Sequence, residues 1–118
     1  MYHKEERSHE FLENLAYNYP DHVTVSSIGK SYEGRDIKLV KVSADKSQTK
    51  KPAVYLDGGL HAREWISVST ALYVAEKLAS GYSNDASIKK LLDHYDFFIV
   101  PLANPDGYEY THTRVRQR

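Results

Sequence analysis

The sequence predicts an α/β fold in which a partial mixed sheet carries helices on both faces. Two observations support this fold class. Apolar residues fall at helical spacing in some segments and in short strand-like runs in others. A strand, a helical region and a second strand follow one another between Val54 and Val100, which predicts a parallel β-α-β crossover. No repeat or Pro/Gly-rich linker divides the 118 residues, so we expect residues 1–118 to belong to a single domain, with no second domain.

The first third of the chain predicts a helix followed by a β-hairpin. The helix has Ser8 as its expected N-cap and Pro20 as its stop, and its apolar stripe is formed by Phe11, Leu12, Leu15, Ala16 and Tyr19. Two apolar runs, Val23–Ile28 and Ile37–Val42, flank a connection bounded by glycines and predict the hairpin. The polar, lysine-rich stretch 44–51 predicts a solvated loop.

A buried strand and a long helix are predicted next. Ala53–Asp57 is a short apolar run ended by a glycine pair, which is typical of a buried strand. The helix that follows has Gly81 as its expected C′ residue, and one face carries Val68, Ala71, Leu72, Ala75 and Leu78.

The last elements expected are a short helix and a strand. The helix begins after Asn84 or Asp85 and directs Ile88, Leu91 and Leu92 inward. The nearly continuous apolar run from Tyr95 to Leu102 predicts a strand covered on both faces. Three helices are few for such a sheet, so we expect the chain to be the N-terminal part of a larger α/β domain.

Composition excludes several classes of protein. The 16 basic and 16 acidic residues cancel, which argues against nucleic acid as a partner. There is no cysteine, so neither a disulfide framework nor a thiolate zinc site can form. The longest apolar run, Phe97 to Ala103, is too short to span a membrane. The N-terminus does not resemble a signal peptide.

The chemistry-bearing residues gather after the strand Ala53–Asp57. His61 and Glu64 are metal-type donors three residues apart, at an expected strand-to-helix turn where ligands of α/β sheets bind. Asp57 is either a partner that orients His61 or a strand-end residue bonded to the backbone. The remaining histidines are read as surface or structural residues: His3, His9, His22, His94 and His112.

The segment from Asp57 to Ser67, which reads DGGLHAREWIS, resembles the zinc-site segment of the carboxypeptidase A/B family of zinc metallocarboxypeptidases. The stretches Ile28–Arg35 and Asn104–His112 resemble two further segments of that family in the same order. The resemblance runs from Tyr2 to about His112 and implies the N-terminal portion of the metallocarboxypeptidase catalytic domain.

The resemblance also implies a function. His61 and Glu64 would be two of three protein ligands of a single Zn²⁺, and Arg63 would contact the peptide substrate. Peptide or protein C-termini are the implied substrates, carboxypeptidase inhibitors are candidate partners, and an extracellular location follows from the resemblance alone. The third zinc ligand, a histidine, and the general-base glutamate come later in the family, so no catalytic set is complete in these residues. The tail offers Arg116 and Arg118 but not the family's Arg-x-x-Arg run.

Two functional readings remain. One is a metallocarboxypeptidase portion that is inactive by itself. The other is a truncated, non-catalytic binding or remnant protein whose incomplete sheet exposes an edge strand. A dinucleotide-binding domain is excluded because the turn after the strand lacks the Gly-x-Gly-x-x-Gly fingerprint.

Overall fold

The computed structural model describes residues 4–45, 51–58 and 65–103, which form a four-stranded mixed sheet and three helices. Along the chain the elements are α1 (Lys4–Asn18), β1 (Val23–Lys30), β2 (Asp36–Val42), β3 (Ala53–Asp57), α2 (Trp65–Gly81), α3 (Ala86–His94) and β4 (Asp96–Val100). The strand order is β1-β2-β4-β3. The expected α/β class and the order of the elements are confirmed.

The expected β-hairpin is formed by β1 and β2. The two strands pair antiparallel from Val23 opposite Val42 to Lys30 opposite Asp36, with a register shift between Ser27 and Gly29. At the turn, Gly34 has a φ of +84°, a conformation that glycine adopts at little cost. The glycine-bounded connection in the sequence therefore closes the hairpin.

The second half of the chain forms the expected parallel crossover. β3 pairs parallel with β4, and β4 pairs antiparallel with β2, so β4 lies in the interior of the sheet. Burial on both faces of β4 confirms the strand expected there. The expectation of a buried strand at β3 is wrong in this structure: β3 is an edge strand, and Ala53, Tyr55 and Asp57 are exposed on one face. In a strand, successive side chains point to opposite faces, so an uncovered face leaves alternate residues in solvent.

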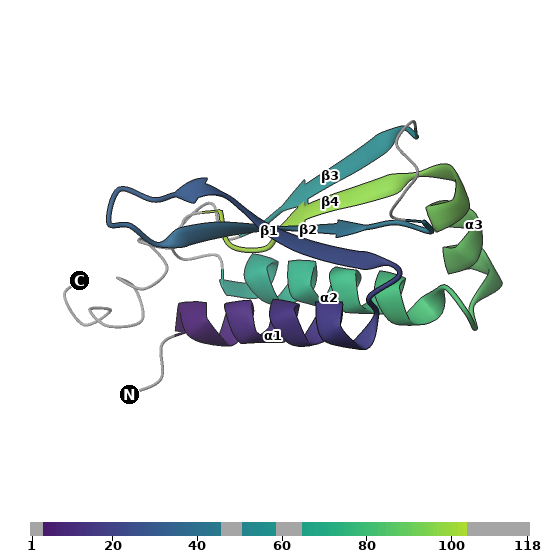
Figure 1. Cartoon of the computed structure of the whole chain (residues 1–118), viewed down its shortest axis with the longest axis horizontal. Coiled ribbons are helices and arrows are strands. Elements are labelled where there is room, and N and C mark those ends of the chain that lie inside the picture. The colour runs from purple at the N-terminus through teal and green to yellow at the C-terminus, as the bar shows by residue number, and fades with distance from the viewer. Residues whose placement is uncertain (1–3, 46–50, 59–64, 104–118) are drawn as a thin grey trace.

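The helices lie on one side of the sheet. Figure 1 shows α1 and α2 side by side beneath it, with α3 at one end. The core between these layers is formed by apolar residues of all three helices and all four strands, with Leu12, Val23, Val40, Ala75, Leu92 and Ile99 each at most 1% exposed. Within residues 4–45, 51–58 and 65–103, no helix covers the opposite face, so the second helical layer expected from the sequence is not among them.

Two helix ends differ from expectation. α1 begins at Lys4 rather than after Ser8, so Ser8 is not the N-cap; its side chain is buried, 4% exposed, inside the helix. α1 ends before Pro20, as expected.

Gly81 is the last residue of α2 rather than a left-handed C′ residue, because its φ is not positive. A Cβ at Gly81 would lie 2.5 Å from Ile88 Cδ1, so the missing side chain lets α3 approach. α3 begins as expected after Asp85, whose carboxylate accepts hydrogen bonds from the backbone N–H groups of Ser87 and Ile88. Leu92 of α3 is buried, but Leu91 is 43% exposed and does not point inward.

None of the helices in the described part of the chain has the length and apolar character needed to cross a membrane.

Candidate metal centre at the carboxyl end of β3

The carboxyl ends of β3 and β4 are held side by side. The Gly58 N–H donates to the Val100 carbonyl at 2.9 Å, and the Ala103 N–H donates to the Gly58 carbonyl at 2.8 Å. Gly58 is buried, as are Pro101 and Leu102 beyond β4. These bonds extend the parallel pairing beyond both strands. The segment after Gly58 and the segment after Ala103 therefore start from the same end of the sheet. This is the end formed by the carboxyl ends of parallel strands, where ligands of α/β sheets bind.

The predicted site residues follow directly from this edge. β3 ends at Asp57 and α2 begins at Trp65, so the connection between them carries His61, Arg63 and Glu64. All three residues lie outside the described part of the chain, as do His3 and the segment Asn104–Arg118. What the structure supplies is the framework: a strand end, a buried glycine and a helix start that bracket the candidate ligands.

Asp57 has a neighbour that the sequence reasoning missed. Asp57 and Tyr55 lie two residues apart on β3 and therefore share its exposed face. Partial burial raises the pKa of the Tyr55 phenol, and the adjacent Asp57 carboxylate raises it further. The alternation of side chains along the strand would have identified this pair. The two roles considered for Asp57 in the sequence both remain predictions, since His61 lies outside the described residues.

The histidines at the other end of the sheet have structural partners. His22 Nδ1 lies 3.0 Å from the Ser43 carbonyl oxygen, and its ring packs 4.6 Å from the Tyr82 ring, centroid to centroid. His94 Nδ1 lies 2.9 Å from the Lys90 carbonyl oxygen. Ser43 follows β2 and His94 precedes β4, so both histidines lie at the amino end of β4, away from Gly58. Among the described residues, no group of three or more His, Cys, Asp or Glu side chains could hold a metal ion.

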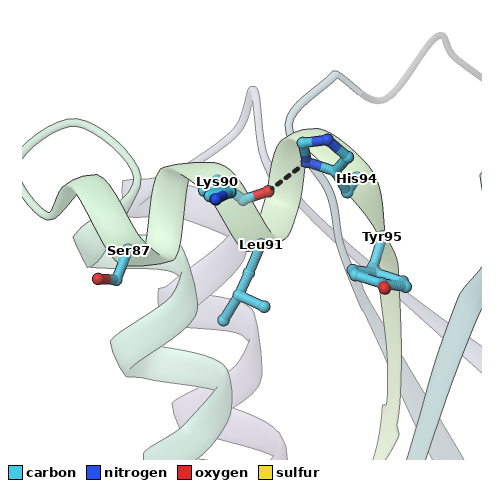
Figure 2. Close-up of a pocket in the computed structure, with 5 residues that line it drawn as sticks. All are labelled: Ser87, Lys90, Leu91, His94 and Tyr95. Carbon is cyan, nitrogen blue, oxygen red and sulfur yellow. Dashed lines mark hydrogen bonds between the residues drawn. The ribbon is translucent and has the colours of Figure 1, made fainter.

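A groove on the outer side of α3 lies at the same far end. It has a volume of about 480 Å³ and is lined by Ser87, Lys90, Leu91, His94 and Tyr95. Figure 2 shows these side chains and the contact between His94 and the Lys90 carbonyl. His94 is the one metal-type donor among these lining residues, so the groove does not offer a second metal centre.

Comparison with known proteins shows which family has a sequence and a framework like these. The family model described as "Zinc carboxypeptidase" (Peptidase_M14) matches residues 8–118. Carboxypeptidase B of Astacus astacus is 41% identical over 115 residues, which are 98% of this chain and 36% of that protein. The inactive metallocarboxypeptidase ECM14 of Ajellomyces capsulatus is 46% identical over 99 residues, 82% of this chain and 17% of that protein.

Solved structures of one further protein have the same fold. The crystal structure of thrombin activatable fibrinolysis inhibitor matches with a TM-score of 0.88 at 38% identity, over 98% of this chain and 29% of that chain. The bovine protein in complex with tick carboxypeptidase inhibitor matches with a TM-score of 0.81 at 37% identity, over 98% of this chain and 36% of that chain. The chain thus spans between 17% and 36% of the length of these proteins. With a family match over nearly all of its residues and a matching fold, the chain belongs to the zinc carboxypeptidase family.

Proposed function

We propose that this chain is the zinc-binding N-terminal portion of a metallocarboxypeptidase that removes C-terminal amino acids from peptides. One observation carries the proposal: the segment that resembles the family's zinc site begins at Asp57, where β3 ends beside the end of β4, and in the sequence it lies between β3 and α2. The edge formed by these two strand ends is where an α/β sheet binds its ligand.

In this proposal His61 and Glu64 supply two of the ligands of one zinc ion. The donor set fits, because a neutral imidazole and a carboxylate are both ordinary zinc ligands. With zinc held by these two residues, the site would gain a Lewis acid that could polarise the scissile carbonyl group and lower the pKa of a water bound to it. A catalytic zinc site uses three protein ligands, and the resemblance assigns no third ligand among these 118 residues.

Arg63 lies between the two proposed ligands in the sequence and is assigned to the substrate. A guanidinium group carries a permanent positive charge and five N–H donors, which suits it to hold peptide carbonyl or carboxylate oxygens beside the metal. Its role is to bind and orient the peptide, while His61 and Glu64 hold the metal.

Metal affinity tests the ligand assignment. Zinc binding to the full chain is measured by competition with a chromophoric chelator, and His61→Ala or Glu64→Ala is expected to weaken it by more than about tenfold, the loss typical for an outer-shell partner. The matched controls are His94→Ala and Glu10→Ala, which remove the same residue types outside the connection. Equal zinc affinity in all five proteins would refute the assignment.

Peptidase activity tests the completeness of the site. We expect the 118-residue chain with zinc to release no C-terminal amino acid from a peptide mixture followed by mass spectrometry, because two protein ligands leave the ion too open for the catalytic geometry. Release at an ordinary enzymatic rate, abolished by a chelator, would contradict this expectation.

The second candidate is a non-catalytic binding protein, favoured by the 46% identity to an inactive metallocarboxypeptidase. In that case zinc affinity would be low and unaffected by His61→Ala, while a carboxypeptidase inhibitor or a peptide C-terminus would still bind. An inhibitor is a proposed partner because the bovine relative is known in complex with one. An extracellular location is likewise proposed from the similarity to this family.

A further inference from the structure

Two buried polar atoms lie at the end of the sheet opposite the candidate metal centre. The hydroxyl oxygen of Ser43 and the Oδ1 atom of Asp96 are both buried, and neither has a hydrogen-bond partner among the described residues. Ser43 is 0% exposed and Asp96 is 4% exposed. Leaving a buried polar group without a partner costs about 1–3 kcal/mol, so two such groups at one end of the sheet are unusual.

The sheet register places these two residues opposite each other. β2 and β4 pair antiparallel, with Lys41 opposite Phe98 and Val42 opposite Phe97. One further step in the same register brings Ser43 opposite Asp96. Alternation puts both side chains on the face of Lys41 and Phe98, where side chains do meet across the strands: Lys41 Nζ lies 5.8 Å from the centre of the Phe98 ring.

Backbone hydrogen bonds show what kind of pair this is. The Ser43 N–H donates to His22 on the β1 side, at 2.9 Å, and the Ser43 carbonyl oxygen contacts His22 Nδ1 at 3.0 Å. The Asp96 N–H donates to Pro52 on the β3 side, at 3.0 Å. Neither residue uses these groups toward the other, so they form a non-hydrogen-bonded pair, in which Cβ atoms are about 4.5–5.5 Å apart and side chains are closest.

We propose that Ser43 and Asp96 form a binding site for one buried water molecule. The Ser43 hydroxyl donates to the water, and the water donates to Asp96 Oδ1. Ser43 brings a donor and Asp96 an acceptor, and the structure contains no direct hydrogen bond between the two side chains. A water that bridges two polar groups is enthalpically nearly as good as a direct bond, and buried waters make two to four such bonds.

For the fold, the consequence is that the register of β4 against β2 is fixed. A slip of β4 by one residue would turn Asp96 toward the apolar layer against α1 and α2 and expose Phe97 and Ile99 on the other face. The bridged pair penalises that slip. It therefore holds the carboxyl end of β4 in line with Gly58.

A crystal structure of the protein at a resolution that shows ordered waters is the direct test. The expected result is a water about 2.5–3.0 Å from both Ser43 Oγ and Asp96 Oδ1. A direct Ser43–Asp96 hydrogen bond without a water, or a dry contact, would overturn the proposal. Magnetic relaxation dispersion of water nuclei gives a second readout in solution, because it counts long-lived buried waters. The count should fall by one in the double variant Ser43→Ala/Asp96→Leu, and an unchanged count would also overturn it.

Stability of the same variants supplies a measurement that requires no crystal. Ser43→Ala and Asp96→Leu are each expected to lower the equilibrium constant for folding about 5- to 100-fold, because each leaves one polar partner buried and unpaired. In the double variant the equilibrium constant for folding should fall much less than the product of the two single fold-changes, since no polar group is then left unpaired. Ser26→Ala and Asp21→Asn, at exposed positions, are the matched controls. If the fold-change of the double variant equalled the product of the two single fold-changes, the two side chains would not share a site, and the proposal would be contradicted.

Discussion

The ion pair between Lys30 and Asp36 joins the two strands of the hairpin. Lys30 Nζ lies 2.7 Å from Asp36 Oδ1, and the two residues are directly opposite in the β1–β2 register. The Ser27 hydroxyl donates to the same carboxylate oxygen at 3.3 Å. The hydrogen bond from Lys30 is the main reason that the pKa of Asp36 lies below its ordinary value. The Lys30 side chain is 64% exposed and that of Asp36 is 35% exposed, so salt screens the pair and it adds little stability at high salt.

The lowered pKa of Asp36 predicts a pH dependence with a definite sign. A carboxyl group with a lower pKa in the folded state adds stability above its unfolded pKa of about 3.9 and loses it as the pH falls through the folded pKa. Carbon-detected NMR titration of the Asp36 carboxyl group is expected to give a midpoint below the ordinary value. Lys30→Gln should raise that midpoint, because it removes the charged donor.

An Asp36 midpoint that is the same in the wild type and in Lys30→Gln would show that the ion pair has no effect in solution.

At the scale of elements, the junction of α2 and α3 depends on a missing side chain. A Cβ at Gly81 would lie 2.5 Å from Cδ1, 3.2 Å from Cγ2 and 3.3 Å from Cβ of Ile88. The Asn84 and Asp85 N–H groups both donate to the Gly81 carbonyl, which fixes the turn between the helices. Asp85 then caps α3, so the two helices are joined by a short connection with little freedom to shift.

Gly81→Ala is therefore expected to destabilise the protein. Overpacking a filled site costs about 1–3 kcal/mol, and the gain in helix propensity of up to about 1 kcal/mol offsets only part of it. The net loss of about 1–2 kcal/mol is measured as the change in the free energy of unfolding by urea denaturation.

Ile88→Val supplies the matched background, because valine lacks the Cδ1 atom that makes the closest contact. By itself Ile88→Val should cost about 0.5–1.5 kcal/mol through the lost methyl group. In that background Gly81→Ala should cost less than in the wild type. An equal cost in both backgrounds would show that the contact with Ile88 is not the cause.

Local sequence signals predicted the elements well where the determinant lies in neighbouring residues. The cap at Asp85, the stop before Pro20 and the turn near Gly34 each rest on side-chain or backbone chemistry within a few residues. Gly81 was found for the wrong reason, because a glycine after a helix has the same local appearance whether it adopts a left-handed conformation or makes room for another helix.

Predictions that depend on tertiary packing were less successful. Ser8 is of a residue type common at helix N-caps, but α1 begins at Lys4 and Ser8 is buried within the helix. Leu91 lies within the apolar pattern of α3 and yet is exposed, because α3 packs at the end of the sheet, where a narrow stripe around Leu92 is covered. At the candidate metal centre, the strand and helix that bracket His61 and Glu64 were predicted, and the ligand roles remain predictions.

At the scale of the whole molecule, the sheet is asymmetric. α1 and α2 cover one face, and the other carries Tyr55, 58% exposed, together with the half-buried Phe98 and Leu39. β3 is paired on one side by β4, and no described strand pairs its other side. Partly exposed apolar side chains beside a strand edge that no described strand pairs form a typical template for association with another strand.

The 118-residue chain by itself is therefore expected to associate through β3. Light scattering should give a mass that rises with protein concentration, and Tyr55→Lys should shift that rise to higher concentration, because edge lysines oppose strand pairing. Tyr17→Lys is the matched control: it makes the same change of charge at an 84% exposed position on α1. Equal effects of the two substitutions would assign the association to net charge rather than to β3. A monomer at all concentrations, with one cooperative unfolding transition, would show that the edge of β3 is protected and that association through it does not occur.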